Sequence, residues 1–175
     1  MFTVPLVGAV TSAPDFAAVF VEHRVRALRL ARLLTDSDAD AEDLVADAFA
    51  RLYPKWRAGK VDDPGGYVRV AIVNGARSRW RRRAVARNRM PSISGASTAG
   101  VSEDQAAALV DRDRIRLALI ALPLQMRAVV ALRVLDDLSE RDTAEVLGVS
   151  TGTVKTQLSR AMARLRADLG EDRDE

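Results

Sequence analysis

LSERDTAEVLGVSTGTVKTQLSRAMARLR, residues 138–166, is the stretch that decides the fold. Ser139, followed three residues later by Asp142, is typical of a capping box and predicts the start of a short helix. Gly148 then allows a tight turn, and Ser150 is placed to cap a longer helix. The apolar positions of that longer helix recur at steps of four, four and three and are expected to face the shorter helix: Val154, Leu158, Met162 and Leu165. The pattern predicts a helix-turn-helix.

The opposite face of the longer helix is small, polar or cationic. Short groups near the N-terminus of a helix let it approach a DNA duplex, and longer donors reach phosphates and base edges in the major groove. The residues of this face, with the capping serine, are Ser150, Thr151, Thr153, Lys155, Thr156, Ser159 and Arg160. A solvated face of an ordinary helical hairpin has the same composition. The joint presence of short helix, glycine turn, cap and cationic helix favours DNA binding.

Two further helices are predicted directly upstream, on either side of Pro123. The first carries Ile115, Leu119 and Leu122, and the second carries Met126, Val129, Val130 and Leu132. Before them, residues 87–101 lose hydrophobic periodicity and are rich in Ser, Gly and Ala, which is typical of a flexible linker.

The first half of the chain is also predicted to be helical. One starts at Pro14, with Ser12 or Ala13 before it, and its apolar stripe is Phe16, Phe20, His23, Ala27, Leu30 and Leu34. A second covers residues 42–56, is capped by Asp38 or Asp40, and buries Leu44, Val45, Ala48, Phe49 and Leu52. Residues 57–66 form a loop. A third helix contains YVRVAIVNGARSRWRRR, residues 67–83; it is expected to bury Val68, Ala71, Ile72 and Gly75 and to leave Arg69, Asn74, Arg77 and Arg81 to a ligand.

Charge is distributed unevenly along these helices. Residues 33–50 hold six acidic residues and no basic one, whereas residues 77–89 hold seven arginines and no acidic residue. Of the 27 basic residues in the chain only Lys55, Lys60 and Lys155 are lysine, and arginine is favoured where phosphates are bound bidentately. An acidic surface repels DNA and a basic one attracts it, so this half of the molecule is expected to have two different partners.

Composition excludes several classes of protein. The chain has 175 residues, 48% of them hydrophobic, which is enough for a folded core. The absence of cysteine excludes disulfides, thiolate zinc sites and a cysteine nucleophile, and indicates a reducing compartment. His23 is the single histidine, and on an apolar stripe it is expected to pack rather than to bind a metal or act as a base.

No apolar run approaches the ~20 residues that span a bilayer. The first residues lack the basic region of a signal peptide. We therefore expect a cytoplasmic protein with no membrane span, no cofactor, no metal and no catalytic residue.

Three quoted segments together resemble a known family. LGVSTGTVKTQLSRAMARLR, residues 147–166, resembles the carboxy-terminal helix-turn-helix of sigma-70 family factors. AEDLVADAFARLYPKW, residues 41–56, followed by the 67–83 segment, resembles the second sigma domain of the extracytoplasmic-function (ECF) group, in its SigE-like branch. The resemblance spans residues 16–169. It implies an all-α fold of two small domains, sigma region 2 and sigma region 4, joined by a flexible linker.

The resemblance also implies partners and site residues. The acidic helix face, with Glu42, Asp43 and Asp47, would dock on the β′ subunit of core RNA polymerase. The implied protein partner is the core enzyme, with its β′ and β subunits. Ala46 departs from the glutamine usual in the family.

The third helix would melt the minus-ten element and hold its non-template strand. Val73 departs from a position that is often basic in the family. The residues implied there are Asn74, Arg77, Arg79, Trp80, Arg81, Arg82 and Arg83. A loop over residues 60–66 would wall the pocket of a flipped base beside Asn74. Trp80 and Tyr67 are open to either stacking or core packing.

For the second domain, the resemblance implies that it reads the duplex minus-thirty-five element. Thr153 and Lys155 would face the DNA backbone, and Thr156, Ser159 and Arg160 would face bases. Leu122-Pro123 and Arg127 match the family pattern, whereas Thr143 stands where isoleucine is common. The implied organisation is an extension (1–12), region 2 (13–86), a linker (87–108), region 4 (109–170) and a tail (171–175). Whether an anti-sigma factor acts on the chain stays open.

Two other functions compete with an alternative sigma factor. A stand-alone helix-turn-helix repressor or activator explains residues 138–166 equally well, but it leaves the acidic helix and the arginine cluster without a task. A carboxylate-based hydrolase has acidic residues to draw on, but no motif ties a pair of them to a pocket.

Overall fold

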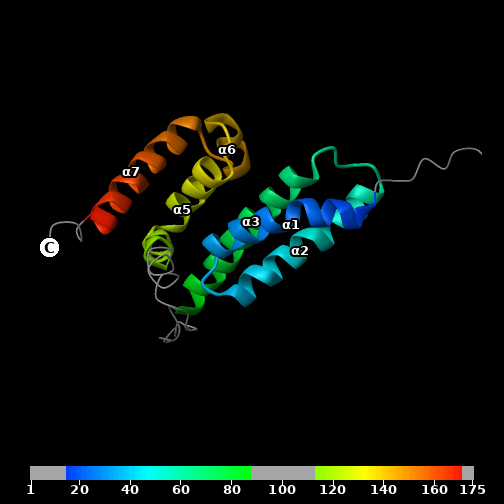
Figure 1. The fold of residues 1–175 in the computed structure, drawn as a ribbon, viewed down its shortest axis with the longest axis horizontal. Coiled ribbons are helices and arrows are strands. Elements are labelled where there is room, and N and C mark those ends of the chain that lie inside the picture. The colour runs from blue at the N-terminus through cyan, green and yellow to red at the C-terminus, as the bar shows by residue number, and fades with distance from the viewer. Residues whose placement is uncertain (1–14, 88–112, 171–175) are drawn as a thin grey trace, which may run out of the picture.

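The computed structural model describes residues 15–87 and 113–170. Within these ranges the chain forms helices and turns and contains no strand, which confirms the all-α expectation. Three long helices, α1, α2 and α3, lie side by side, and α5, α6 and α7 form the other half (Figure 1). The predicted N-terminal extension, the predicted linker beyond Arg87 and the predicted tail lie outside the described residues.

Helix α1 spans Phe16–Leu34 and is capped by Asp15. The Asp15 carboxylate accepts a hydrogen bond from the backbone N–H of Ala17 at 3.0 Å, so the predicted start at Pro14, with Ser12 or Ala13 as the cap, is wrong. Its predicted apolar stripe is confirmed, because Ala27, Leu30 and Leu34 are buried and the earlier members of the stripe are half-buried.

Helix α2 spans Asp38–Arg57, and its cap is Ser37. The Ser37 hydroxyl accepts from the N–H of Asp40 and donates to its carboxylate. A serine hydroxyl can donate and accept at the same time, which an ionised carboxylate cannot. The predicted cap at Asp38 or Asp40 and the predicted start at residue 42 are wrong, because the helix already begins at Asp38. The predicted buried stripe of this helix is confirmed in full: Leu44, Val45, Ala48, Phe49 and Leu52.

Helix α3 spans Pro64–Arg87 and begins earlier than the predicted loop 57–66 allows. Pro64 occupies the first helical position, where a missing N–H costs nothing, and the carboxylate of Asp63 accepts from the N–H of Gly66 at 2.9 Å. A Cβ on Gly65 would lie 3.0 Å from the His23 ring. His23 of α1 therefore packs against the start of α3, which confirms that it is a packed residue of the apolar stripe. Val68 and Ile72 are buried, also as predicted.

The second half begins with a helix over residues 113–121. Helix α5, Leu124–Val130, follows Pro123 and runs directly into a π-helical turn, η1, at Ala131–Leu135. Ile115 was expected to belong to the core but is 48% exposed, so that part of the predicted stripe is wrong. Leu122, Met126 and Val130 are buried, as predicted.

Helices α6, Glu140–Leu147, and α7, Thr151–Gly170, form the predicted helix-turn-helix. Ser139 and Asp142 make the capping box, and Gly148 adopts φ 61°, a left-handed conformation that suits glycine. Ser150 accepts from the N–H of Thr153. Each of these sequence features is confirmed.

The packing of α7 differs in part from the prediction. Val154 is fully buried and shares a core cluster with Leu147 of α6, as expected. Further along, Ala161 and Leu165 pack with Met126 of α5 rather than with α6. The second half of α7 extends past the short helix α6, so its inner face turns toward α5.

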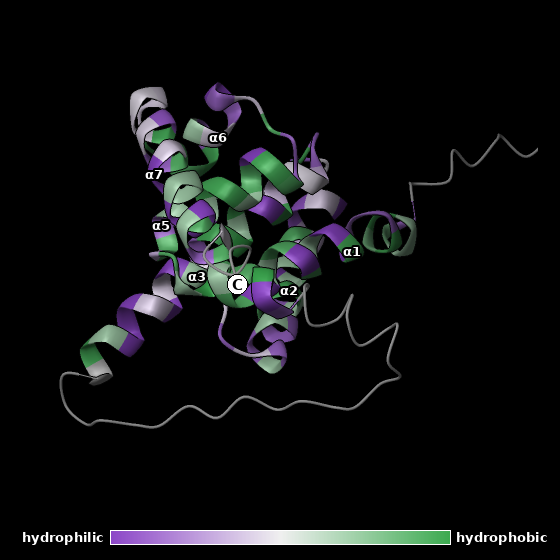
Figure 2. Ribbon diagram, turned by 60° about the vertical axis from the view of Figure 1, so that its left-hand side comes forward, coloured by the Kyte–Doolittle hydropathy of each residue, from purple (hydrophilic) through white to green (hydrophobic). Residues whose placement is uncertain are grey.

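The two halves are in contact with each other. Helix α5 and turn η1 pack against α1, and α6 packs against α3. One hydrophobic cluster contains Leu30 of α1 and Ile72 of α3 together with Val129 of α5 and Leu147 of α6. The long helices carry alternating hydrophobic and hydrophilic stripes (Figure 2). The shared apolar surface therefore holds the two halves in one arrangement.

Candidate protein and nucleic-acid interfaces

The acidic residues of α2 lie on its outer face. Glu42, Asp43 and Asp47 are exposed. Glu42 and Asp43 form no ion pair within the described residues, whereas Asp47 lies 3.6 Å from Arg79. Ala46, at the position usually held by glutamine, is exposed between them. This face offers carboxylates to a basic partner and is not covered by the other half of the chain.

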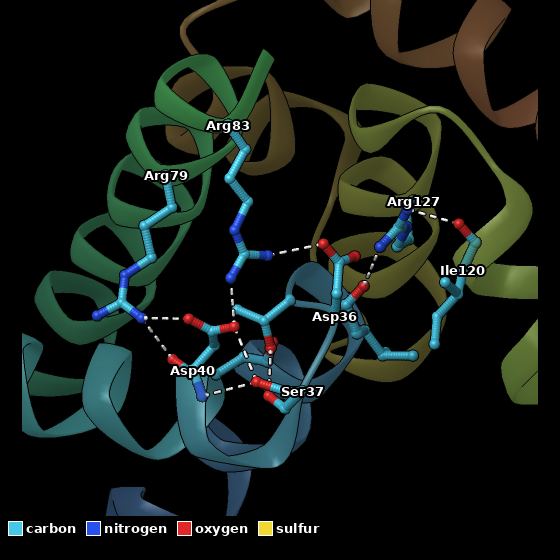
Figure 3. Close-up of polar contacts among 10 residues, drawn as sticks. Asp36, Ser37, Asp40, Arg79, Arg83, Ile120 and Arg127 are labelled. Carbon is cyan, nitrogen blue, oxygen red and sulfur yellow. Dashed lines mark hydrogen bonds and ion pairs between the residues drawn. The ribbon is translucent and has the colours of Figure 1, made fainter. Parts of the chain in front are cut away.

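Arg79 and Arg83 attach α3 to the start of α2 (Figure 3). Arg79 donates to the backbone carbonyl of Asp40 at 2.9 Å, and Arg83 contacts Asp36 at 2.7 Å and the carboxylate of Asp40. The hydrogen bond from Arg83 lowers the pKa of Asp40, and the same bond raises the pKa of Arg83. Both arginines therefore already have carboxylate partners within this domain.

Two other arginines of α3 reach the second half of the chain. Arg69 pairs with Asp136 at 2.9 Å, and Arg77 donates to the carbonyl of Leu147, the last residue of α6, at 2.8 Å. Both arginines were predicted to be left to a ligand, and in this arrangement each has a partner in the second half of the chain. A carbonyl at the C-terminal end of a helix is a good acceptor for a cation, because it has no partner within the helix.

The remaining members of the arginine cluster stay accessible. Arg81 and Arg82 are exposed, and Arg81 contacts only the Ser78 hydroxyl among the described residues. Trp80 directly precedes Arg81 in the sequence and is 51% exposed. Tyr67 instead packs against the core, with the Lys55 ammonium 5.0 Å from its ring centroid. Of the two aromatic residues, Trp80 is the one available for stacking.

Asn74 lines a shallow cavity of about 190 Å³ between α2 and α3. Arg51, Ser78 and Arg82 contribute donors to the same cavity. The lining includes no residue of the predicted wall at residues 60–66, because that stretch ends in the first turn of α3, about two helical turns before Asn74. The structure thus pairs Asn74 with α2 rather than with that loop.

The outer face of α7 divides into residues used locally and residues left open. Ser150 and Thr153 bond to each other in the cap, Thr156 donates its hydroxyl to the carbonyl of Gly152, and Lys155 lies 3.4 Å from Glu140. Thr151, Ser159 and Arg160 are exposed and make no side-chain bond within the described residues.

Sequence reasoning missed the partners of the arginines. Asp36, Asp40 and Asp136 belong to the site as carboxylates that position α3. Arg127 matches the family pattern, but its role was not foreseen: it is buried and donates to the carbonyls of Leu33, Ile120 and Leu122. Burial lowers its pKa. The acidic run at residues 33–50 was the one available signal for Asp36 and Asp40.

Comparison with known proteins identifies the family. Residues 19–85 match the family model for Sigma-70 region 2, and residues 112–165 match that for Sigma-70, region 4. The chain is 37% identical over 149 residues to the RNA polymerase sigma-E factor of Streptomyces avermitilis, covering 84% of this chain and 80% of that protein. It is 32% identical over 156 residues to the ECF RNA polymerase sigma factor SigM of Mycobacterium tuberculosis, covering 89% and 77%.

Solved structures share the fold. The sigma factor RpoE of Bartonella quintana, crystallised with the anti-sigma factor NepR, has a TM-score of 0.69 at 23% identity, covering 91% of this chain and 99% of that chain. CnrH, in complex with the cytosolic domain of CnrY, has a TM-score of 0.61 at 25% identity, covering 90% and 88%.

The chain belongs to the sigma-70 family, in its ECF group. It is an alternative sigma factor, which binds core RNA polymerase and directs transcription initiation at promoters. Sigma factors in general are not enzymes. Within the described residues, no helix is long and apolar enough to cross a membrane.

Proposed function

We propose that this sigma factor works through three faces: the acidic face of α2, the basic face of α3 and the outer face of α7. The observation that carries the proposal is that all three present exposed charged or polar side chains in one chain, on three different helices. An ordinary helix-turn-helix regulator needs only the third face. The boundaries that we propose for the two domains are residues 13–86 and 109–170.

The acidic face of α2 is assigned to core polymerase. Glu42 and Asp43 have no intramolecular ion partner among the described residues, and Asp47 is held only by a 3.6 Å contact to Arg79 in which Asp47 is the exposed partner. A carboxylate exposed to water gains little from such a pair, so Asp47 can exchange Arg79 for a cation of the polymerase at small cost. Charge complementarity then gives the docking its specificity.

The basic face of α3 is assigned to the melted non-template strand. Trp80 supplies a surface for an unstacked base, and Arg81 and Arg82 supply cations for phosphates. Asn74 lies in a cavity with several donors, which suits the edge of a flipped base. Arg79 and Arg83 act as positioning residues through Asp40, and Arg77 joins the strand-binding set when it leaves Leu147.

The outer face of α7 is assigned to the duplex minus-thirty-five element. Arg160 and Ser159 have open side chains for base edges, and Ser150 with Thr153 keeps the N-terminus of α7 capped as it approaches the DNA. Lys155 contacts a phosphate after leaving Glu140. Binding at either DNA site raises the effective concentration of the other, so two modest contacts are enough for one promoter.

We also propose a regulatory partner and a cellular location for this chain. RpoE of Bartonella quintana and CnrH were each solved with a partner, the first an anti-sigma factor and the second a cytosolic domain. We propose that an anti-sigma factor also binds this chain. The chain acts in the cytoplasm, without a cofactor or metal, and catalyses no reaction of its own.

Run-off transcription tests the function directly. Core polymerase is supplied with a promoter library, with and without the protein. Specific initiation that depends on the protein supports the proposal. Binding of the protein to a duplex site with no effect on initiation would favour the stand-alone regulator instead.

A further inference from the structure

A cleft of about 860 Å³ lies between α3 and the second half of the chain. Arg77, Trp80 and Arg81 of α3 line one side, and residues 120–127 with Arg164 of α7 line the other. Small-molecule sites in proteins have volumes of about 300–1,000 Å³. The cleft therefore has the size that holds an organic ligand rather than a single ion.

Every charged residue in the lining of this cleft is an arginine. The four are Arg77, Arg81, Arg127 and Arg164. Within the described ranges, none of them forms an ion pair with a carboxylate. A guanidinium offers a planar set of donors that matches the oxygens of a phosphate group. The cleft is therefore suited to an anion that carries phosphate.

Arg127 is a buried cation that lacks an anionic partner. It is 9% exposed, and it donates to the carbonyls of Leu33, Ile120 and Leu122 (Figure 3). Its Nε has no hydrogen-bond partner in residues 15–87 and 113–170. Burial lowers its pKa, because the charged form is held partly out of water. Buried charges in proteins are normally paired. An anion in the cleft would supply the missing partner.

Trp80 and an apolar wall give the cleft a surface for a flat ring. The side chain of Trp80 is 51% exposed. The apolar residues of the other side include Leu122, Leu124 and Met126. Aromatic side chains stack on nucleobases of every kind, because each base has a π-face. A ligand that combines a flat ring with phosphate groups fits both parts of the lining, and a nucleotide is such a ligand.

We propose that this cleft is a binding site for a free nucleoside triphosphate, with the base between Trp80 and the apolar wall and the triphosphate against the arginines. The site does not depend on the strand-binding role given to α3 above. Arg127, Arg164 and the apolar wall belong to neither of the proposed DNA-binding faces. A bound nucleotide would cover Trp80 and Arg81, so it would compete with the melted strand for them.

The probe is ATP labelled with a fluorescent N-methylanthraniloyl group, and the measurement is its anisotropy with the full chain in the absence of polymerase. We expect saturable binding and complete displacement by unlabelled ATP. Adenosine and tripolyphosphate each carry one half of the ligand, so each should displace the probe less effectively than ATP. Tripolyphosphate as effective as ATP, or a probe that does not reach saturation, would overturn the proposal.

Arg164→Ala is the test variant, and Arg166→Ala is its matched control. Both remove one positive charge from exposed positions of α7, so both change the general attraction to anions equally. Arg166 does not line the cleft. Arg164→Ala is expected to weaken ATP binding about 10-fold, as the loss of one charge-assisted hydrogen bond would, and Arg166→Ala is expected to match the parent. Equal affinities of the two variants, with helix content intact, would overturn the site.

A second variant and a second competitor complete the test. Trp80→Ala should lower the affinity for ATP and leave that for tripolyphosphate unchanged, and it decides the question if Arg164→Ala loses helix content. An affinity for ATP that Trp80→Ala does not change would overturn the placement of the base. A short single-stranded DNA separates the free nucleotide from the strand. If Arg164→Ala weakens that DNA as much as it weakens ATP, the cleft binds nucleotides of the strand, and the proposal of a free nucleotide is overturned.

Discussion

Arg79 of α3 lies 3.6 Å from Asp47 of α2, so a residue proposed to position the strand-binding helix and a residue proposed to meet the polymerase form one ion pair. Asp47 is 59% exposed and Arg79 is 19% exposed. The hydrogen bond to the carbonyl of Asp40 is made by Nη1 of Arg79, whereas Asp47 lies near Nη2. We therefore expect docking at Asp47 to leave the bond between Arg79 and Asp40, and with it α3, in place.

The docking assignment predicts the effect of charge reversal. Asp43→Lys with Asp47→Lys should abolish association with core polymerase, because both side chains meet cations of the partner. Helix content should not change, since both residues lie on the outer face. The measurement is co-purification with core enzyme, with circular dichroism as the check on folding.

Glu22→Lys with Asp168→Lys makes the same change in net charge at exposed positions outside this face. This control should co-purify normally. Equal retention of both double variants would remove Asp43 and Asp47 from the interface.

The assignment of α7 to the duplex minus-thirty-five element predicts two kinds of loss in DNA affinity. Arg160→Ala should cost about 1–3 kcal/mol at the preferred upstream element and relax its sequence preference, because the open guanidinium is assigned to a base edge. Lys155→Ala should weaken all sequences alike, because a phosphate contact carries no sequence information. Affinities across a library of duplex sites check both. A uniform loss for the Arg160 variant would mean that the two roles are exchanged.

A buried hydroxyl in α6 predicts a stabilising substitution. Thr143 is fully buried, and its Oγ1 has no hydrogen-bond partner within the described residues. An unsatisfied buried polar group costs about 1–3 kcal/mol, so Thr143→Val should raise the free energy of unfolding by about 1 kcal/mol. Urea denaturation measures it. Thr156→Val, which removes an exposed hydroxyl bonded to Gly152, should give no gain; a gain of equal size there would contradict the explanation.

The Asp40 cluster predicts how stability depends on pH. The hydrogen bond from Arg83 holds the pKa of Asp40 below its ordinary value of 3.8. The folded form therefore binds this proton less readily than the unfolded form, so the contribution is complete above about pH 4 and is lost as pH falls through the lowered pKa. The free-energy difference between the parent and Asp40→Asn should shrink over that acidic range. A difference that stays constant from neutral pH to below pH 3.8 would show that the carboxylate contributes nothing as a charge.

Local patterns predicted the helices and most of the core. Capping boxes and apolar periodicity act over a few residues, which is why Ser139, Gly148 and the buried stripe of α2 could be read from the sequence. Competing caps could not be ranked in this way. Ser37, Asp38 and Asp40 are all good capping residues, and the choice of Ser37 depends on its mutual bonds with Asp40.

The partners of the arginines could not be predicted for a different reason. Arg69 meets Asp136 and Arg77 meets Leu147 across 67 and 70 residues of chain. Periodicity places these arginines on a polar face, but it contains no information on what lies opposite. The sequence therefore indicated the composition of the basic face, and the structure divides it into arginines that hold the fold and arginines that are exposed.

The most direct test of the account is permanganate footprinting of thymines across the start region, with holoenzyme carrying Arg81→Ala and Arg82→Ala. These two arginines are exposed and, unlike Arg79 and Arg83, do not pair with Asp40, so their loss should not disturb α3. On duplex promoter DNA, we predict that thymine reactivity is strongly reduced while core binding is retained. On a template with a pre-melted bubble, reactivity should recover only in part, because strand retention is still impaired; each lost phosphate contact should also lower the logarithmic salt slope by about 0.7. Normal thymine reactivity on the duplex would contradict the assignment of promoter melting to α3.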